Sequence, residues 1–281
     1  MAGVSGGAVV VITGGASGLG LATAKALTSR GGRVALIDRD ADAVHAAAQS
    51  LGAETLGVAA DICDAEAVTD AIGQIVDRFG AIDVVMACAG ISGWGPALLV
   101  DSAYWERTIE TNVLGTWRTV KAALPHLVQS KGYLLIVASG MAASPGPASS
   151  AYAASKAAVE SLGRSLRIEL AHHGVDVGVA YYSFLDTPMV DAIERNPAAM
   201  RGRAAMPAPV RRTYPIDKAA AATATGIEHR APRVIYPGFL RWALLLRGFF
   251  GPRSDKAAIK AMPEVERLAT DHQSSAPPPI G

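Results

Sequence analysis

Cysteine is scarce in this sequence, and so is any excess of charge of one sign. The 281 residues include two cysteines, Cys63 and Cys88, and carry a formal net charge of +1. Two cysteines in so long a chain argue against a disulfide scaffold and favour a reducing compartment, and neither has the spacing of a metal ligand. The balanced charge argues against a nucleic-acid partner. We therefore expect no bound metal and no bound nucleic acid.

Long hydrophobic runs are also absent. No stretch reaches the roughly 20 apolar residues of a membrane-spanning helix. The N-terminal sequence "MAGVSGGAVVVITGG" lacks a basic segment, and its apolar run is too short for a signal peptide. These absences predict a cytoplasmic protein without a transmembrane segment.

The sequence does contain a regular alternation of short apolar runs and alanine-rich helical segments. The expected strands cover 8–13, 33–38, 55–61, 82–90, 132–139, 175–182 and 233–237. The expected helices cover 18–30, 40–51, 64–79, about 101–130 and a segment that begins near residue 149. Apolar runs that are each followed by a helix are typical of parallel strands buried on both faces. The sequence therefore predicts an α/β fold, a doubly wound and mostly parallel sheet with helices on both faces, in a single domain over 1–251.

Two segments depart from this alternation. Residues 183–215 are rich in Pro, Met and Arg and lack a clear periodicity, so we expect a lid-like insertion there. Residues 252–281 end in "SSAPPPIG", and we expect them to form a loosely ordered C-terminal extension.

The first strand runs into the glycine-rich stretch "TGGASGLG", residues 13–20. Gly14, Gly18 and Gly20 follow a T-G-x-x-x-G-x-G spacing, with a helix directly after them. Glycines there allow a tight turn and let backbone N–H groups approach a pyrophosphate at the positive end of the helix. An ordinary turn is the alternative, but the first strand–helix junction of a doubly wound sheet favours a dinucleotide site.

Acidic residues end the next two strands. Asp38 lies 18 residues after Gly20, near the offset of about 20 at which an acid binds the ribose 2′-hydroxyl of adenosine. A carboxylate there repels a 2′-phosphate, so we expect NAD rather than NADP, although Arg39 could stack on adenine or accept a phosphate. Asp61 could bond the adenine edge. For both acids a helix cap is the alternative, and for Asp38 a solvated turn is another.

The stretch "SSAYAASKAAVESLGRSL", residues 149–166, is predicted to be a helix with Tyr152 and Lys156 on one face. The rest of that face is mostly apolar, and an ammonium is costly to bury there without a partner. Ser139 ends the preceding strand at the carboxyl edge, where such sheets bind ligands. Asn112 lies in the helical region before that strand, where a surface amide or a bend in the helix is the alternative.

Together these residues resemble the classical short-chain dehydrogenase/reductase family. The matching residues are Thr13-Gly14-x-x-x-Gly18-x-Gly20, Asp61, Ala89-Gly90, Asn112, Ser139, Tyr152-x-x-x-Lys156 and "DTPM" at 186–189. They follow the family's order and spacing from about residue 7 to residue 190, with a weaker likeness to about residue 240. The resemblance implies a Rossmann-type fold and a nicotinamide cofactor.

The resemblance also implies a role for each residue. Tyr152 would be the general acid/base that takes the proton of a substrate alcohol while hydride passes to the nicotinamide. Lys156 would stabilise the phenolate and bond the ribose, Ser139 would hold the substrate oxygen, and Asn112 would anchor a water in a proton relay. The residues expected to bind the cofactor are Thr13, Gly14, Ser17, Gly18, Leu19, Gly20, Asp38, Arg39, Asp61, Ile62, Ala89, Gly90, Tyr152, Lys156 and Thr187.

The implied activity is that of an NAD(H)-dependent oxidoreductase that interconverts a secondary alcohol and a ketone. The side chains in segments expected to line the substrate pocket are Trp94, Met141, Tyr182, Phe184 and Met189. If they face the substrate, the pocket is apolar and suits a hydrophobic molecule, and packing within the core is the alternative. A nucleotide-binding scaffold without catalysis and an NADP-linked ketone reductase are the two other functions left open.

Two stretches differ from the family's usual pattern. "ACAG" at 87–90 stands where Asn-Asn-Ala-Gly is usual, and the missing amide bears on local stability more than on chemistry. We expect Cys88 to be a small buried hydrophobe rather than a reactive thiol. In "YYSFLDTPM", Tyr182-Ser183 replace a usual Pro-Gly pair, so the loop beside the nicotinamide is expected to follow a different path.

The helix that carries Tyr152 has a second face of small side chains. This face consists of Ala154, Ala157, Ser161, Ser165 and Ile168. The family resemblance implies that it packs against a second subunit, in a homodimer or homotetramer. Packing within the chain is the alternative.

The segment "FLRWALLLRGFF" at 239–250 is unusually apolar. On a helix, one face would carry Phe239, Trp242, Ala243, Leu246, Phe249 and Phe250. The segment is too short to span a bilayer. A subunit contact, a cover over the substrate and an interfacial membrane helix flanked by Arg241 and Arg247 all fit the pattern.

Overall fold

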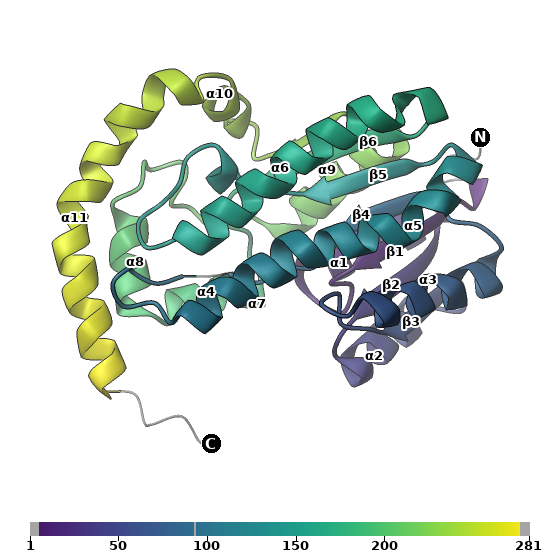
Figure 1. Ribbon diagram of the computed structural model, residues 1–281, viewed down its shortest axis with the longest axis horizontal. Helices are drawn as coiled ribbons and strands as arrows, with labels where there is room; N and C mark the ends of the chain where they lie inside the picture. The colour runs from purple at the N-terminus through teal and green to yellow at the C-terminus, as the bar shows by residue number, and fades with distance from the viewer. Residues whose placement is uncertain (1–5, 93, 276–281) are drawn as a thin grey trace.

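The structure of the chain, a computed structural model, describes residues 6–92 and 94–275, without the side chains of 249–254 and 273–275. Its centre is one sheet of seven parallel strands in the order β3-β2-β1-β4-β5-β6-β7 (Figure 1). The strands are β1 (Val9–Thr13), β2 (Arg33–Asp38), β3 (Thr55–Ala59), β4 (Val84–Ala87), β5 (Tyr133–Val137), β6 (Asp176–Tyr182) and β7 (Arg233–Tyr236). The predicted doubly wound, Rossmann-type sheet is confirmed.

Helices follow the strands in the alternation that the sequence predicts. The α-helices are α1 (Gly18–Thr28), α2 (Ala41–Leu51), α3 (Ala65–Phe79), α4 (Ser102–Ile109), α5 (Thr116–Ser130), α6 (Ser150–Leu170), α7 (Pro188–Glu194), α8 (Pro197–Ala204), α9 (Ile216–Glu228), α10 (Leu240–Leu245) and α11 (Arg247–Ser275). The shorter helical turns are η2 (Glu110–Gly115), η3 (Gly140–Ala142) and η4 (Ala171–His173). Asp40, Asp64 and Asp101 accept backbone N–H groups at the starts of α2, α3 and α4, which satisfies donors that a helix end leaves unpaired.

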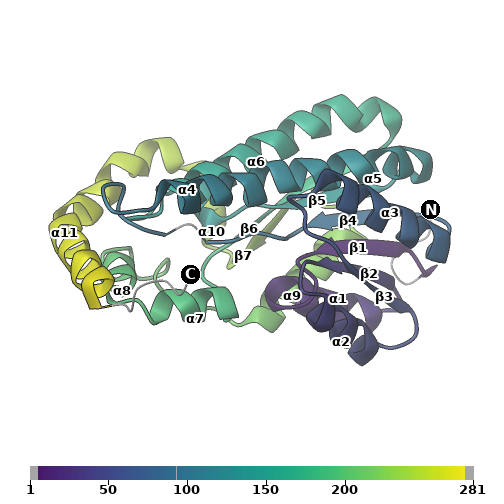
Figure 2. The ribbon, with the colours of Figure 1, turned by 60° about the horizontal axis from the view of Figure 1, so that its bottom comes forward.

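The helices form a layer on each face of the sheet (Figure 2). Buried residues of α3, α5 and α6 pack on one face, and those of α1, α2 and α9 pack on the other. In β1, Val9 and Val11 join the first layer, while Val10 and Ile12 join the second. All four side chains are fully buried, so a continuously apolar run is what this strand requires.

The expected helix over about 101–130 is interrupted in its middle. Between α4 and α5 lies the π-helical turn η2, which contains the fully buried Asn112. Thr116 Oγ1 donates to the carbonyl oxygen of Asn112 at 2.8 Å. Such single π turns inside a helix are frequent at functional sites.

The expected insertion at 183–215 contains α7 and α8 and returns to its starting point. Leu185 and Tyr214 form an isolated parallel bridge. Backbone hydrogen bonds run from Asp186 N to Tyr214 O at 3.0 Å and from Tyr214 N to Phe184 O at 2.8 Å. The insertion is therefore a closed excursion from the carboxyl edge of the sheet.

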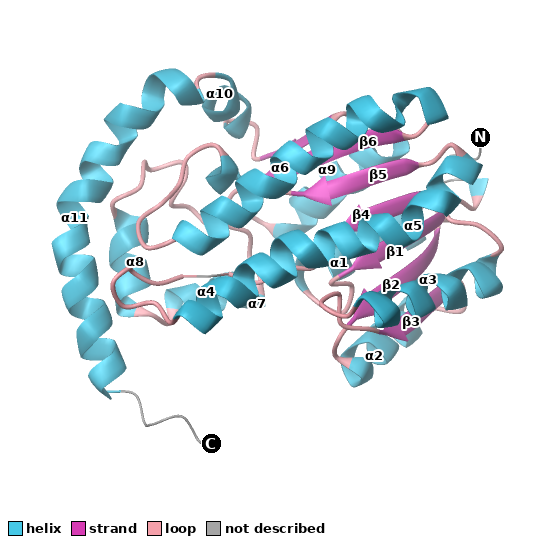
Figure 3. Cartoon of the chain, in the orientation of Figure 1, coloured by secondary structure: helices cyan, strands magenta, loops and turns pink. Residues whose placement is uncertain are grey.

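The C-terminal extension differs from the loosely ordered tail expected over 252–281. Its described part belongs to the long helix α11, which stands beside α8 at one end of the molecule (Figures 1 and 3). Ala261, Val265 and Ala269 recur every four residues and are buried. A helix that buries one face in this way is held by its neighbour rather than by its own propensity.

The expected domain boundary after residue 251 falls inside α11, which begins at Arg247. The proline-rich end that suggests a tail lies in 276–281, outside the described residues. In the part of the chain that the structure covers, no helix has the length and apolarity needed to cross a membrane.

Candidate active site

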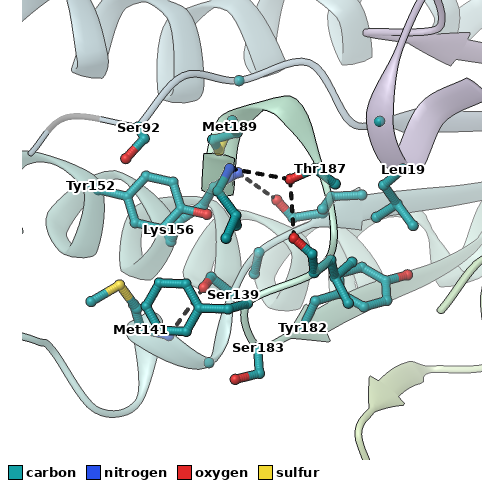
Figure 4. Close-up of a pocket in the computed structure, with 18 of the residues that line it drawn as sticks. Leu19, Ser92, Ser139, Met141, Tyr152, Lys156, Tyr182, Ser183, Thr187 and Met189 are labelled. Atoms are coloured by element: carbon teal, nitrogen blue, oxygen red, sulfur yellow. Dashed lines mark hydrogen bonds between the residues drawn. The ribbon is translucent and has the colours of Figure 1, made fainter. Parts of the chain in front are cut away.

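A cavity of about 670 Å³ lies at the carboxyl edge of the sheet. Figure 4 shows Tyr152 and Met141 on one side of it and Leu19 and Thr187 on the other. The predicted site residues that line the cavity are Gly14, Ser17, Gly18, Leu19, Gly20, Asp38, Arg39, Asp61, Ile62, Ala89, Gly90, Trp94, Ser139, Met141, Tyr152, Lys156, Tyr182, Phe184, Thr187 and Met189. Thr13 and Asn112 are buried behind its wall.

The glycine turn after β1 has a shape that only glycine permits. Gly14 has φ +67°, and a Cβ built on it would lie 2.9 Å from Ala89 Cα. A Cβ on Gly20 would lie 2.1 Å from the carbonyl oxygen of Gly14. Helix α1 begins directly there, and Ser17 at its N-cap makes no side-chain capping bond. The backbone N–H groups at this helix end therefore suit a diphosphate.

Thr13 braces this turn instead of facing the cavity. Its Oγ1 accepts hydrogen bonds from Cys88 N at 3.1 Å and from Ala89 N at 3.2 Å. The bonds tie the end of β1 to the loop after β4, where the family's usual amide is missing. Cys88, expected to be buried, is half-buried and lines the cavity. Desolvation raises the pKa of its thiol to about 11, so the thiol stays protonated at neutral pH.

Asp38 and Asp61 line the end of the cavity at β2 and β3. The helix-cap alternative is wrong for both, because Asp40 and Asp64 are the N-caps of α2 and α3. Asp38 Oδ2 instead accepts from Ala16 N at 3.2 Å, which places the carboxylate beside the glycine turn. Arg39 and Ile62 line the same end. Both carboxylates thus line the cavity next to the glycine turn, and their contact with an adenosine stays a prediction.

Gly90 lets two polar side chains approach the loop after β4. A Cβ built on it would lie 3.0 Å from Asn112 Oδ1 and 3.5 Å from Lys156 Nζ. Asn112 Nδ2 donates to Ile91 O at 2.9 Å and to Ser155 Oγ at 3.0 Å, and its Oδ1 accepts from Ile91 N at 2.8 Å. The amide therefore braces this loop against α6. A water relay through Asn112 stays a prediction.

Lys156 reaches the cavity from one turn beyond Tyr152 on α6. Its Nζ donates to Val137 O at 3.0 Å and lies 5.6 Å from the centre of the Tyr152 ring. The residue is buried, and that burial lowers the pKa of its ammonium to about 8. An ammonium can donate three hydrogen bonds, so donors are left for a ligand at this wall.

Tyr152 and Ser139 meet at the same wall. Burial raises the pKa of the Tyr152 hydroxyl, its hydrogen bond with Ser139 lowers it, and the neighbouring Cys88 thiol raises it further. Ser139 Oγ also accepts from Met141 N at 3.2 Å, which fixes the side chain at the start of η3. The two hydroxyls are placed to hold one alcohol or carbonyl oxygen between them.

Thr187 faces the glycine turn from the opposite side. Its Oγ1 accepts from Val190 N at 3.4 Å and thereby caps α7. A Cβ built on Gly18 would lie 3.7 Å from Thr187 Cγ2. The insertion therefore begins within reach of a nucleotide bound on the turn.

The side chains predicted to line a substrate pocket do line the cavity, with one difference at Tyr182. Its hydroxyl shares a 2.5 Å hydrogen bond with Thr223 Oγ1 on α9, and the residue is 5% exposed. In Figure 4 this hydroxyl points away from Tyr152. Tyr182 thus packs into the core at the edge of the cavity, which is the alternative that the sequence left open for this side chain.

Several lining residues were not predicted from the sequence. Two of them, Ala143 and Pro147, lie in the loop after η3. The others come from the insertion and are Ala199, Arg203, Met206, Pro207, Pro209 and Val210. Composition alone marked the insertion as unusual, and no residue pattern in it identifies Arg203.

The apolar segment 239–250 also contributes to the cavity. The described members of its predicted apolar face, Phe239, Trp242, Ala243 and Leu246, all line it. The side chains of Phe249 and Phe250 lie outside the described part of the chain.

Within residues 6–92 and 94–275, no three His, Cys, Asp or Glu side chains gather into a metal-binding group. The site therefore combines a glycine turn, two carboxylates at the ends of β2 and β3, a wall of Ser139, Tyr152 and Lys156, and an apolar far end.

Known proteins that resemble this chain are consistent with the fold and the site described above. A model of the short chain dehydrogenase family matches residues 8–198. Cis-4-hydroxycyclohexanecarboxylate dehydrogenase of Sinomonas cyclohexanicum is 34% identical over 220 residues, 77% of this chain and 87% of that protein. A short-chain reductase of Streptomyces niveus is 35% identical over 193 residues, 68% of this chain and 74% of that protein.

A solved structure shares the fold over most of its length. It is the 3-ketoacyl-(acyl-carrier-protein) reductase from Brucella melitensis complexed with NADH, with 28% identity and a TM-score of 0.74. The match covers 82% of this chain and 96% of the reductase. The family match, the sheet and the site lead to one conclusion: the chain belongs to the short-chain dehydrogenase family of oxidoreductases.

Proposed function

We propose that the chain is an NAD(H)-dependent oxidoreductase that interconverts a secondary alcohol and a ketone on a hydrophobic substrate. The observation that carries the proposal is the single cavity wall on which Ser139, Tyr152 and Lys156 meet, in a cavity that begins at the glycine turn. A bound nicotinamide supplies the hydride acceptor or donor. The NADH in the Brucella reductase supports this choice of cofactor.

Tyr152 is the residue that moves the substrate proton. Its phenolate takes the hydroxyl proton in oxidation, and its hydroxyl returns a proton in reduction, while Ser139 holds the substrate oxygen. Burial raises the pKa of Tyr152, so the phenolate needs a nearby cation. Lys156, with a pKa of about 8, is mostly protonated at neutral pH and provides that charge 5.6 Å from the ring centre.

A panel of hydrophobic secondary alcohols and ketones, followed through NADH absorbance, tests the function. Turnover of any panel member with NAD or NADH supports it. Binding of the cofactor without turnover of any member contradicts it and favours a nucleotide-binding scaffold.

Asp38 is proposed to set the preference for NAD over NADP. Asp38→Asn keeps an acceptor for Ala16 N but removes the charge that repels a 2′-phosphate. We expect the ratio of kcat/KM for NAD to that for NADP to fall by at least about 10-fold, about 1.4 kcal/mol. Asp42→Asn, an exposed charge change on α2 outside the cavity, is the control and should leave the ratio unchanged. An unchanged ratio in Asp38→Asn would point to Arg39 and an NADP-linked reductase.

The small-residue face of α6 is proposed to contact a second subunit, in a homodimer or homotetramer. Ala154, Ala157, Ser161, Ser165 and Ile168 are all exposed, so the face is not packed within the described chain. Ser161→Arg should shift the sedimentation coefficient to that of a monomer, because the new side chain separates closely packed helices. Gln49→Arg on the exposed side of α2 should not. A wild-type protein that sediments as a monomer would refute this proposal.

For the segment 239–250 we propose the role of a substrate cover. The support is that Phe239, Trp242 and Leu246 line the apolar end of the cavity. The outward exposure of Trp242 and Leu245 keeps a subunit contact and an interfacial membrane contact as the other two predictions. Location in the cytoplasm also stays a prediction from the sequence.

A further inference from the structure

The charged side chains around the cavity fall into three groups. Asp38, Arg39 and Asp61 lie at the nucleotide end, and Lys156 lies at the catalytic wall. At the apolar end, beyond Tyr152, the charged lining residues among those described are Arg203 and Arg247. A substrate that carries a carboxylate would need one of these two guanidinium groups as its partner.

Arg203 is already paired within its own insertion. The residue is 6% exposed, and its guanidinium lies over the Phe184 ring, 4.2 Å from the ring centre. Its Nη1 donates to Glu194 Oε1 at 2.8 Å, and its Nε and Nη2 donate to Arg211 O at 2.9 Å and Thr213 Oγ1 at 2.6 Å. A carboxylate that reaches this guanidinium would therefore have to share it with Glu194.

Arg247 is paired with a carboxylate from the catalytic helix. Its Nη1 donates to both carboxylate oxygens of Glu160, at 3.1 and 3.0 Å. The Glu160 side chain is 10% exposed and lies one turn after Lys156 on α6. The nearly buried Glu160 carboxylate favours keeping this cation, because without it Glu160 would have no charged partner among the described residues and would retain only its hydrogen bond with Tyr181.

We infer that the apolar end of this cavity selects uncharged alcohols or ketones and rejects those that carry a carboxylate. An incoming carboxylate would be desolvated against Met141, Phe184 and Met206 and would have to compete with Glu160 or Glu194 for a guanidinium. An uncharged substrate has no charge to desolvate and does not compete with either glutamate. The statement about turnover rests on the proposed function, whereas the statement about binding does not.

The test compares two ligands that differ in one charge, cis-4-hydroxycyclohexanecarboxylate and its primary amide. Each is titrated into the full-length protein by calorimetry, with and without NADH. We expect the amide to bind at least about 10-fold more tightly than the acid, the factor that corresponds to about 1.4 kcal/mol. An amide that binds no more tightly than the acid, including the absence of binding by either, overturns the inference.

Glu160→Gln tests the cause. It leaves Arg247 without its carboxylate, so the affinity for the acid should rise by about 10-fold while that for the amide stays constant. Glu264→Gln, which unpairs Arg201 on the outer side of α8, is the matched control and should change neither. An acid affinity in Glu160→Gln equal to that of the wild type overturns the explanation by Arg247, and the wild-type comparison stands even if this variant does not fold.

Turnover of the same two compounds separates this inference from the proposed function. Preferential oxidation of the acid would refute the selectivity and leave the dehydrogenase activity standing. Tighter binding of the amide without oxidation of any alcohol would refute the dehydrogenase activity and leave the selectivity standing.

Discussion

Tyr152→Phe should lower kcat by about 10²–10⁴-fold, the range of a lost general acid/base, and leave cofactor binding intact. The substitution removes only the hydroxyl, so the ring beside Lys156 Nζ is kept. Because burial raises the pKa of Tyr152 while Lys156 keeps its charge up to its pKa of about 8, wild-type alcohol oxidation should also accelerate as pH rises toward about 8 and more phenolate forms. That acceleration should be absent from the variant. NADH absorbance gives the rates, and titration calorimetry gives the cofactor affinity.

Tyr133→Phe is the matched control. Tyr133 is fully buried, burial raises its pKa too, and its hydroxyl donates to Ala231 O at 2.8 Å, away from the cavity. Losing this part-buried hydrogen bond should cost about 0.5–1.5 kcal/mol of folding stability, with kcat nearly unchanged. Equal turnover by Tyr152→Phe and the wild type would remove Tyr152 from the mechanism.

The sheet could be predicted because buried parallel strands leave a local signal. Every residue from Val9 to Ile12 must be apolar, since alternate side chains enter opposite helix layers. The glycine turn is local in the same way, because the φ of Gly14 and the close approach at Gly20 each exclude a side chain. Patterns of this kind can be recognised in a single sequence, because they do not depend on contacts between residues far apart in the chain.

The ion pair at the apolar end of the cavity could not be predicted from any local sequence pattern. Arg247 and Glu160 are 87 residues apart, and an arginine in an apolar segment is equally compatible with a membrane surface. Thr13 shows the same limit at shorter range. Its place in the glycine motif predicts cofactor contact, whereas its hydroxyl is taken by backbone N–H groups that only the folded sheet brings near.

Helix α11 was missed because its order depends on a partner. The buried Ala261 and Val265 are small side chains that mark only a narrow apolar face, and they are buried beside α8. Proline-rich composition after residue 275 then favoured a tail. The insertion between β6 and α9 is thus braced from outside by α11 while it lines the cavity from within, an arrangement that no single segment encodes.

Gly20→Ala should abolish productive cofactor binding. The new Cβ would lie 2.1 Å from the carbonyl oxygen of Gly14 and 3.2 Å from Gly15 Cα, so the turn has to open and its N–H groups lose their common direction. We expect the dissociation constant of NADH to rise by at least about 100-fold, which corresponds to about 2.7 kcal/mol. Overpacking should also cost about 1–3 kcal/mol of folding stability. Calorimetric titration and thermal unfolding measure the two effects.

Gly73→Ala makes the same chemical change where the structure has room for it. Gly73 lies within α3, and a Cβ there meets nothing within 4 Å. Since alanine favours a helix over glycine by about 1 kcal/mol, this control should unfold at the same or a higher temperature and bind NADH as the wild type does. If Gly20→Ala bound NADH equally well, the diphosphate would have to lie elsewhere in the cavity, and the assignment of the adenosine end to Asp38 and Asp61 would fall with it.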